Sequence, residues 1–342
     1  MTSPAAPPSM PSDDAVLLVN LGTPDEPTPQ AVRRYLAQFL GDPRVVELPR
    51  FLWLPILYGV VLPRRPAASA AKYAKVWTEE GSPLRVHTRR QAALVARALE
   101  GQGVRVEWAM RYGNPSIGEA LSRLATAGVR RLCVVPLYPQ YAASTTASVE
   151  DEIEKGLRRI GANIDIHGVR DFHDDPAYIA AVAAQLREHV AQAGPCDRLL
   201  MSFHGLPQRT VDRGDPYRDQ CVATASLIAK AVGLAEGRWQ LSFQSRFGAA
   251  RWLQPYSVEV LRQWGREGVA RVDVICPGFV SDCLETLEEM GLENREAFLV
   301  AGGRDYRLVP CLNERPEWIS ALASLAMRGL AAEKSQKMAA GG

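Results

Sequence analysis

Short apolar runs separated by amphipathic stretches follow one another along the chain. The first run, residues 15–20 (AVLLVN), shows no alternation with polar residues and ends in a Gly-Thr-Pro turn. A continuous apolar run of this length indicates a parallel strand that is buried on both faces. Thr28 and Pro29 suit the N-cap and first position of a helix that Gly41 ends. The chain is therefore predicted to open with a strand, a turn and a helix.

The same alternation of strands and helices continues to residue 276. Helices are predicted at about 88–100, at 116–127, after Asp175, after Asp215, and up to about 266. Further strands are predicted at 104–110, 132–137, 164–169, 199–203, 239–244 and 271–276. Strands that alternate with helices form parallel sheets covered on both sides, so the fold class is predicted to be α/β.

Three short landmarks occur in the same order in both halves of the chain. They are GTP at Gly22 and GLP at Gly205, RYG at Arg111 and RFG at Arg246, and PLY at Pro136 and PGF at Pro277. Three weak matches in one order carry more weight than any single match. We therefore expect two related α/β domains that face each other across a cleft, with the division near Ile160.

The two domains are predicted at 13–160 and 161–314. Residues 315–332 form an amphipathic pattern, which predicts a last helix that packs back on the body of the protein. Residues 1–12 and 333–342 are rich in small and polar residues, and we expect them to be disordered.

Composition narrows the choice of function. The 342 residues are 47% hydrophobic and 23% charged, as in soluble globular proteins of two domains. A net charge of +2 argues against a nucleic-acid partner held mainly through its phosphates. The first residues lack the basic and apolar regions of a signal peptide, and the six cysteines include no CxxC pair. We therefore expect a cytoplasmic protein with reduced thiols.

Residues 51–62 (FLWLPILYGVVL) are the most apolar stretch. They are shorter than the ~20 residues that a membrane-spanning helix needs, and Pro55 and Gly59 interrupt them. We interpret them as a core segment or as an apolar lip over a pocket, which if exposed also suits contact with a membrane surface. A basic run follows, and it is either a solvated helix face or an anchor for an anionic ligand. Its members are Arg64, Arg65, Lys72 and Lys75.

His204 follows the predicted strand 199–203, where Gly205 and Pro207 force a turn. Ligands of open α/β sheets bind beyond the carboxyl ends of the strands, so a histidine here suits a metal ligand or a proton acceptor. The alternative is a histidine whose hydrogen bonds are satisfied within the turn. This stretch alone leaves both interpretations open.

The turn after strand 271–276 holds the possible partner of His204. If residues 277–289 (PGFVSDCLETLEE) enter a helix, Asp282, Glu285 and Glu289 lie on one of its faces. Acidic residues at the start of a helix often serve only as caps. Together with a histidine at the corresponding end of the same sheet, however, they suit a site that holds a divalent cation and moves protons.

Seven stretches of the chain resemble one family, in order and over nearly the whole length apart from the termini. They are LVNLGTPDEP, YAKVWTEEGSPL, MRYGNP, PLYPQYAASTTAS, SFHGLPQRTVDRGDPY, FQSRFG with ARWLQP, and CPGFVSDCLETLEE. In these stretches the chain resembles ferrochelatase, in its bacterial form. The resemblance implies two Rossmann-like, chelatase-type three-layer domains around a porphyrin cleft, and the insertion of ferrous iron into protoporphyrin IX as the last step of heme synthesis.

The resemblance also implies roles for individual residues. His204 and Glu285 match the catalytic pair at the metal site, and Asp282 and Glu289 continue an acidic line behind Glu285. The positions that match the lining of the macrocycle are Leu21, Arg111, Tyr112, Tyr138 and Trp252, and those near its propionates are Tyr73 and Ser82. Two pyrrole protons must leave as the metal enters, so a base near the ring centre fits this chemistry. Arg64 and Arg65 suit the propionates.

The chain departs from the family at two places. Cys283 stands where many relatives have a second histidine, which leaves the ligand at that point open, although a thiol also binds metals. Ala143 and the C-terminal tail lack the cysteines that hold a two-iron cluster in the mitochondrial enzymes. We therefore expect neither an iron-sulfur cluster nor any permanently bound cofactor, with Fe(II) as a substrate.

Two alternatives of different kinds accompany this prediction. One is a chelatase of the same fold that acts on coproporphyrin III, on another tetrapyrrole or on another divalent metal. The other is a non-catalytic two-domain protein that binds a tetrapyrrole, which needs apolar walls but no proton acceptor aligned with acidic residues. The sequence leaves the oligomeric state open.

Overall fold

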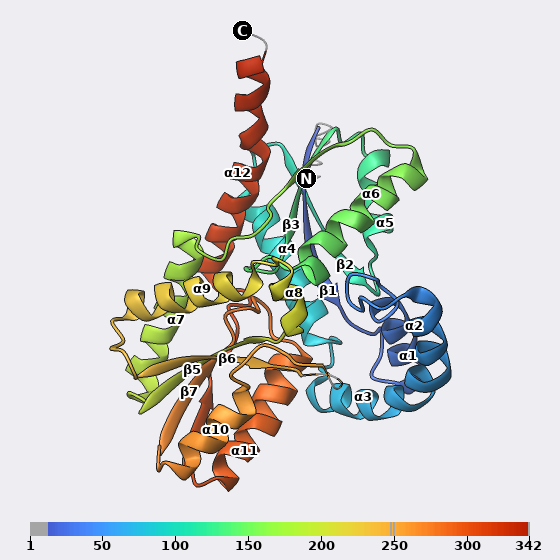
Figure 1. The fold of residues 1–342 in the computed structure, drawn as a ribbon. Helices are drawn as coiled ribbons and strands as arrows, with labels where there is room; N and C mark the ends of the chain where they lie inside the picture. The colour runs from blue at the N-terminus through green and yellow to red at the C-terminus, as the bar shows by residue number, and fades with distance from the viewer. Residues whose placement is uncertain (1–12, 247, 249, 341–342) are drawn as a thin grey trace, which may run out of the picture.

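The computed structural model describes residues 13–246, 248 and 250–340, with side chains as far as residue 331. Its strands form two parallel sheets of four strands each (Figure 1). In the first sheet the order is β2 (Val104–Tyr112), β1 (Asp14–Gly22), β3 (Arg131–Pro136) and β4 (Asp165–Gly168). In the second it is β6 (Trp239–Gln244), β5 (Arg198–His204), β7 (Arg271–Ile275) and β8 (Asp305–Leu308). The two sheets have the same topology, which confirms the predicted pair of related α/β domains.

The sequence landmarks lie at equivalent strand ends. Gly22 ends β1 and Gly205 follows β5, and Pro136 ends β3 while Pro277 follows β7. The loops after β2 and β6 also fold back onto their own strands in the same way. Met110 N donates to Pro115 O at 2.7 Å, and Phe243 N donates to Pro255 O at 2.8 Å. Residue 247 of the RFG landmark lies outside the described residues. The carboxyl ends of both sheets thus carry the repeated turns.

Helices cover both faces of the first sheet. On one face lie α4 (Pro83–Ala98) and α12 (Pro316–Ala340), and on the other α5 (Ile117–Thr126) and α6 (Ser148–Ile160). Along β1, Val16 and Leu18 join the core beside α4 and α12, whereas Leu17 and Val19 join the core beside α5 and α6. This alternation confirms that the apolar run at 15–20 is buried on both faces.

The second sheet is covered in the same way. One face of this sheet packs against α7 (Pro176–Ala193) and α9 (Tyr217–Val232). On the other face lie α10 (Ser257–Arg266), the π-helix η3 (Glu285–Asn294) and α11 (Arg295–Val300). The predicted caps are present, since Asp175 accepts from the backbone of α7, and Asp215 from the nitrogen of Tyr217.

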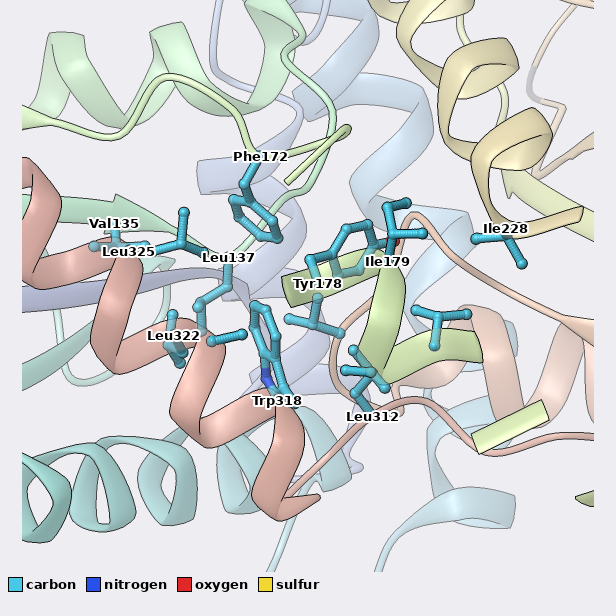
Figure 2. Close-up of a cluster of buried hydrophobic side chains, with 14 of the residues drawn as sticks. Val135, Leu137, Phe172, Tyr178, Ile179, Ile228, Leu312, Trp318, Leu322 and Leu325 are labelled. Atoms are coloured by element: carbon cyan, nitrogen blue, oxygen red, sulfur yellow. The ribbon is translucent and has the colours of Figure 1, made fainter. Parts of the chain in front are cut away.

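One hydrophobic core joins the two domains. The fully buried Trp318 of α12 packs with its ring centroid 5.6 Å from that of Phe172 and 6.1 Å from that of Tyr178 (Figure 2). Helix α12 follows the second sheet in the chain, yet it packs on β3 and β4 of the first sheet. The last helix therefore packs back on the body, as predicted.

Three more helices form a cap beside the first sheet (Figure 1). They are α1 (Pro29–Phe39), α2 (Arg50–Ile56) and α3 (Leu62–Val76), with the short π-helix η1 (Leu57–Val61) between the last two. Thr28 caps α1, as predicted, by accepting from Ala31 N. The segment 51–62 fits both interpretations of its sequence. It buries Trp53 and Leu57 in the cap, but it exposes other large apolar side chains.

The structure corrects three boundaries. Strand β4 pairs with β3, so a division near Ile160 cuts the first sheet, and the second domain begins after Gly168. Helix α4 begins at Pro83, five residues upstream of the predicted start, since Ser82 and Pro83 suit its N-cap and first position. The predicted disordered tail is helical as far as Ala340, whereas residues 1–12 and 341–342 lie outside the described residues.

Candidate active site

His204 is the last residue of β5, and the turn after it is tightly built. A Cβ on Gly205 would lie 2.7 Å from Gln244 O and 3.1 Å from the Trp252 ring, so this position requires glycine. The His204 Nδ1 lies 2.6 Å from the carbonyl oxygen of Gly205, which only accepts hydrogen bonds. Nδ1 therefore carries the proton of the neutral ring, and Nε2 keeps its lone pair for a metal or a proton.

Glu289 lies beside His204 and is held by the end of β6. Its carboxylate accepts from Ser245 N at 2.7 Å and from Ser245 Oγ at 2.5 Å. Burial raises the pKa of Glu289, as does the charge of Glu285, whereas Ser245 and His204 act against this shift. Glu289 thus shares one electrostatic environment with His204 and Glu285, and it is suited to hold a proton.

Gln244 fixes the start of η3. Its Nε2 donates to Glu285 O at 2.9 Å and lies 3.4 Å from the Glu289 carboxylate, while its Oε1 accepts from Ser202 Oγ at 2.7 Å. Glu285 itself is half-buried at the first position of the π-helix. The sequence prediction missed Gln244. Its place at the end of a predicted strand, like that of His204, was a usable signal, and the structure pairs these two residues across β5 and β6.

The acidic helix packs against aromatic side chains of the first domain, since Leu284, the residue before Glu285, contacts the cap cluster that contains Tyr35 and Tyr73. Burial and then the charges of Glu285 and Cys283 raise the pKa of the Tyr73 hydroxyl well above its ordinary value. Burial, Tyr73 and Glu285 do the same for Tyr35, which the sequence prediction did not include. Tyr73 and Tyr35 belong to α3 and α1, and Glu285 belongs to η3. The structure therefore brings the aromatic cap of one domain to the acidic helix of the other.

Arg111 and Tyr112 end β2, but their polar groups are bound to Asp42. Arg111 Nη2 donates to Asp42 Oδ2 at 2.6 Å, and the Tyr112 hydroxyl donates to the same oxygen at 2.8 Å. Ser148 Oγ donates to it as well, at 2.6 Å. Burial alone would raise the pKa of Asp42, but these hydrogen bonds and the guanidinium charge outweigh burial and lower it. Arg111 is thus committed to an internal ion pair.

The other residues matched to the porphyrin site lie near the carboxyl ends of β1, β3 and β5. Ser82 is buried and accepts from Thr23 Oγ1 at 2.8 Å, and Leu21 packs against the cap that contains Tyr73. The Tyr138 hydroxyl and Trp252 Nε1 are buried without a hydrogen-bond partner among the described residues. Such groups gain stability when a bound molecule supplies a partner.

Asp282 is held by hydrogen bonds to residues other than His204, Glu285 and Glu289. It precedes η3, and its carboxylate accepts from Thr286 Oγ1 at 3.0 Å and from Asn313 Nδ2 at 2.7 Å. The prediction assumed that a helix begins at Asp282, whereas the π-helix begins three residues later, and the Asp282 carboxylate also accepts from Cys311 N at 3.3 Å. Cys283 is also buried, and burial and Glu285 raise the pKa of its thiol well above its ordinary value.

The basic run is divided between two roles. Lys72 and Lys75 form ion pairs with Glu288, so they are not free anchors for an anionic ligand. Arg65 is partly buried near Tyr35 and Tyr73, and burial lowers its pKa. Arg64 is exposed on the same helix. The run is therefore not a single anion-binding surface, since its two lysines belong to the ion pairs with Glu288.

A second group with ligands suited to a metal lies elsewhere. Among the described residues, Asp171, His173 and Asp174 bring one ligand atom each within 4.8 Å of the others. They lie between β4 and α7, beside a surface pocket lined in part by Phe172 and Arg328. The sequence prediction gave these residues no role.

Comparison with solved structures defines the class of fold. SirB from Bacillus subtilis with Fe3+ superposes with a TM-score of 0.58 at 14% identity, covering 94% of this chain and 98% of that chain. The sirohydrochlorin chelatase SirB from Bacillus subtilis subspecies spizizenii, in complex with cobalt, gives 0.53 at 13% identity, covering 94% and 97%. At this identity the likeness concerns the fold alone, which is the two-domain chelatase fold expected from the sequence.

Sequence comparison then identifies the family. The ferrochelatase family model matches residues 13–330. Ferrochelatase of Azoarcus sp. (strain BH72) is 60% identical over 90% of this chain and 85% of its own length, and that of Nitrosomonas europaea is 51% identical over 95% and 93%. The chain belongs to the ferrochelatase family. It is therefore an enzyme, a lyase of heme biosynthesis that acts on ferrous iron and a porphyrin, as the resemblance implied.

Proposed function

We propose that this chain inserts Fe(II) into protoporphyrin IX between its two domains, with His204 and Glu285 as the catalytic pair. One observation carries the proposal. The η3 helix that bears Glu285 and Glu289 lies against the aromatic cap, because Glu288 of η3 pairs with Lys72 and Lys75 of α3, and Leu284 packs against the cluster that contains Tyr73. A flat aromatic macrocycle fits between an aromatic wall and a row of ligands and bases.

His204 is the first proton acceptor in this proposal. Its Nε2 lone pair takes a pyrrole proton, and the bond from Nδ1 to Gly205 O orients the ring and stabilises the imidazolium that results. Glu285 and Glu289 lie near His204 on η3, and they differ in that the Glu289 carboxylate is bound by Ser245. Glu289, whose pKa is raised, can accept the second proton and pass it away from the ring.

The walls of the site supply binding energy for the macrocycle. Tyr138 and Trp252 present large rings with a buried polar group, which suits stacking against a porphyrin. Binding energy from such contacts can offset the cost of bending the ring, and a bent ring turns its pyrrole lone pairs towards the metal. We assign the propionates to Arg64 and Arg65 of the cap helix α3, because a guanidinium group can bind a carboxylate through two parallel hydrogen bonds.

The preference for protoporphyrin IX over coproporphyrin III stays part of the proposal, because the two differ in the number of propionates. Steady-state assays under anaerobic conditions with Fe(II) and each porphyrin compare the two directly. A higher kcat/KM for protoporphyrin IX is expected, and a preference for coproporphyrin III would overturn the substrate assignment. In the same assay the double variant His204→Ala, Glu285→Ala is expected to lose iron insertion, and retained turnover would overturn the catalytic assignment.

The segment 51–62 suits contact with a membrane surface. Its exposed apolar side chains are Phe51 at 76%, Tyr58 at 54%, Leu52 at 52%, Val60 at 46% and Ile56 at 44% of their full exposure. So many large apolar side chains together on one surface segment mark an interaction site. None of the helices in the described part of the chain is long and apolar enough to cross a bilayer.

We therefore propose a cytoplasmic enzyme that touches the membrane peripherally through 51–62 and carries no permanent cofactor. Sedimentation with vesicles of anionic phospholipid checks the membrane contact, with Phe51→Ser, Tyr58→Ser as the test variant. Binding that is equal in the two proteins, or absent in both, would contradict it.

A further inference from the structure

A buried glutamate on η3 connects the acidic helix to the aromatic cap. Glu288 is 1% exposed, and its carboxylate lies 3.2 Å from Lys72 Nζ and 2.9 Å from Lys75 Nζ. The lysine side chains are 42% and 52% exposed, and Lys72 also reaches Glu293 at 2.5 Å. A buried carboxylate is tolerated only when it is paired, so this group differs from an ordinary surface ion pair.

The position of this ion-pair group in the two helices is specific. On α3, Lys72 and Lys75 lie on either side of Tyr73 in the sequence, and Tyr73 belongs to the buried cluster against which Leu284, the neighbour of Glu285, packs. On η3, Glu288 lies three residues after Glu285 and directly before Glu289. The ion pairs therefore join the two helices within one turn of the groups that face each other across the proposed porphyrin site.

The two sides of the site depend on this connection to different degrees. Glu289 is bound by Ser245, and Glu285 by Gln244, both within the second domain. Tyr73 belongs to the cap, whose core includes Leu21 and Tyr112 of the first domain. The base and metal side thus has its own supports, whereas the distance of the Tyr73 wall from that side depends on contacts between the domains.

We propose that the Lys72–Lys75–Glu288 group holds the Tyr73 wall at the distance that a porphyrin requires, so that these three are positioning residues for porphyrin binding. They act through Tyr73 and the cap, and they touch neither the metal nor the reacting nitrogens. This inference rests on the proposed function, since it takes the space between Tyr73 and Glu285 as the porphyrin site.

The test is the double variant Lys72→Ala, Lys75→Ala in the full-length enzyme. We expect KM for protoporphyrin IX, and the Kd of the metal-free porphyrin measured by fluorescence quenching, to rise about tenfold, with kcat within about twofold of the original. The matched control is Lys155→Ala, Arg158→Ala, which removes two exposed positive charges that pair within α6 only. The control is expected to leave KM, Kd and kcat unchanged.

Removal of both lysines leaves a buried carboxylate unpaired, so a second variant guards against simple unfolding. Glu288→Gln breaks the same pairs and leaves only exposed lysines, and it is expected to raise KM and Kd by a similar factor. The combined variant Lys72→Ala, Lys75→Ala, Glu288→Gln is expected to match either parent, because all three changes break one interaction. Lys72→Arg, Lys75→Arg, which keeps both charges, is expected to restore KM.

Two results would overturn the inference. One is an unchanged KM and Kd in Glu288→Gln, and the other is a loss of kcat at constant KM, which would assign the group to the chemistry. Either result counts against the positioning role only if the unaltered enzyme inserts iron. An unaltered enzyme without iron insertion would instead contradict the proposed function.

Discussion

The two domains hold their sides of the site in opposite ways. On the second domain, His204 and Glu289 are fixed by short hydrogen bonds to the turns that end β5 and β6, and Glu289 is a carboxyl whose pKa is raised. On the first domain, Asp42 gathers Arg111, Tyr112 and Ser148, and its pKa is lowered. The second domain thus holds Glu289 in a form suited to proton transfer, whereas in the first domain the Asp42 carboxylate has a structural role.

This difference shows how a duplicated fold can divide its work. The same strand order places turns at the same edge of each sheet, but β5 ends in His204 whereas the equivalent strand β1 ends in Gly22. The first domain instead supports an aromatic cap through buried polar contacts. Three substitutions test the contrast, and their expected effects decrease in the order given.

The largest effect is expected for His204→Ala, because it removes the proposed proton acceptor. General-base catalysis typically contributes 10²–10⁴-fold, so kcat for iron insertion should fall by about 10³-fold with little change in KM for the porphyrin. His87→Gln is the control, since His87 bonds Glu314 and has no place in the site. A kcat for His204→Ala within about tenfold of the original would place the proton acceptor elsewhere.

Asp42→Asn should have the next largest effect, and it should act on stability. Loss of a buried charged acceptor that serves three donors is expected to lower the free energy of unfolding at pH 7 by about 2–3 kcal/mol. A carboxyl whose pKa is lowered on folding stabilises the fold above its ordinary pKa, and this contribution is lost as the pH falls through the folded value.

Urea unfolding between pH 7 and the acid limit measures this difference for Asp42→Asn. The difference in the free energy of unfolding between the variant and the original should become smaller towards acid pH. Asp25→Asn is the control, because Asp25 makes a longer and more exposed contact with Arg34 at 3.9 Å. A difference in the free energy of unfolding that does not depend on pH would show that the charge of Asp42 does not stabilise the first domain.

The smallest effect is expected for Glu289→Gln, and its pH dependence should have the opposite sign. A carboxyl whose pKa is raised on folding stabilises the fold below the ordinary pKa of Glu, about 4.3, and loses that contribution as the pH rises through the folded value. The neutral glutamine avoids this loss. The free energy of unfolding of the variant relative to the original should therefore increase as the pH rises from 4 to 8, by less than the loss expected for Asp42→Asn. A relative decrease over this range would contradict the raised pKa.

Much of the architecture could be predicted because its signals are local. Continuous apolar runs such as 15–20 mark buried parallel strands, and the Thr28 and Asp175 caps mark helix starts. The repeat of the turns at Gly22 and Gly205 was enough to predict two related domains. His204 was placed correctly at a strand end because the strand before it and the glycine after it are both strong local signals.

The remaining features depend on contacts between distant parts of the chain. Strand β8 was missed because its four residues, Asp305–Leu308, include two charged side chains that pair at the sheet edge. Strand β4 was assigned to the wrong domain because pairing with β3 leaves no mark in its own sequence. Glu288 was overlooked between Glu285 and Glu289, since only the position of α3 shows that this acid is buried and paired.

The central claim is that a porphyrin binds between the aromatic cap and His204. A crystal structure of the enzyme with metal-free protoporphyrin IX tests it most directly. The account predicts a macrocycle between Tyr73 and η3, with His204 Nε2 within about 3 Å of a pyrrole nitrogen, directly or through one water. A macrocycle bound elsewhere, or one with His204 Nε2 turned away from its centre, would contradict the claim.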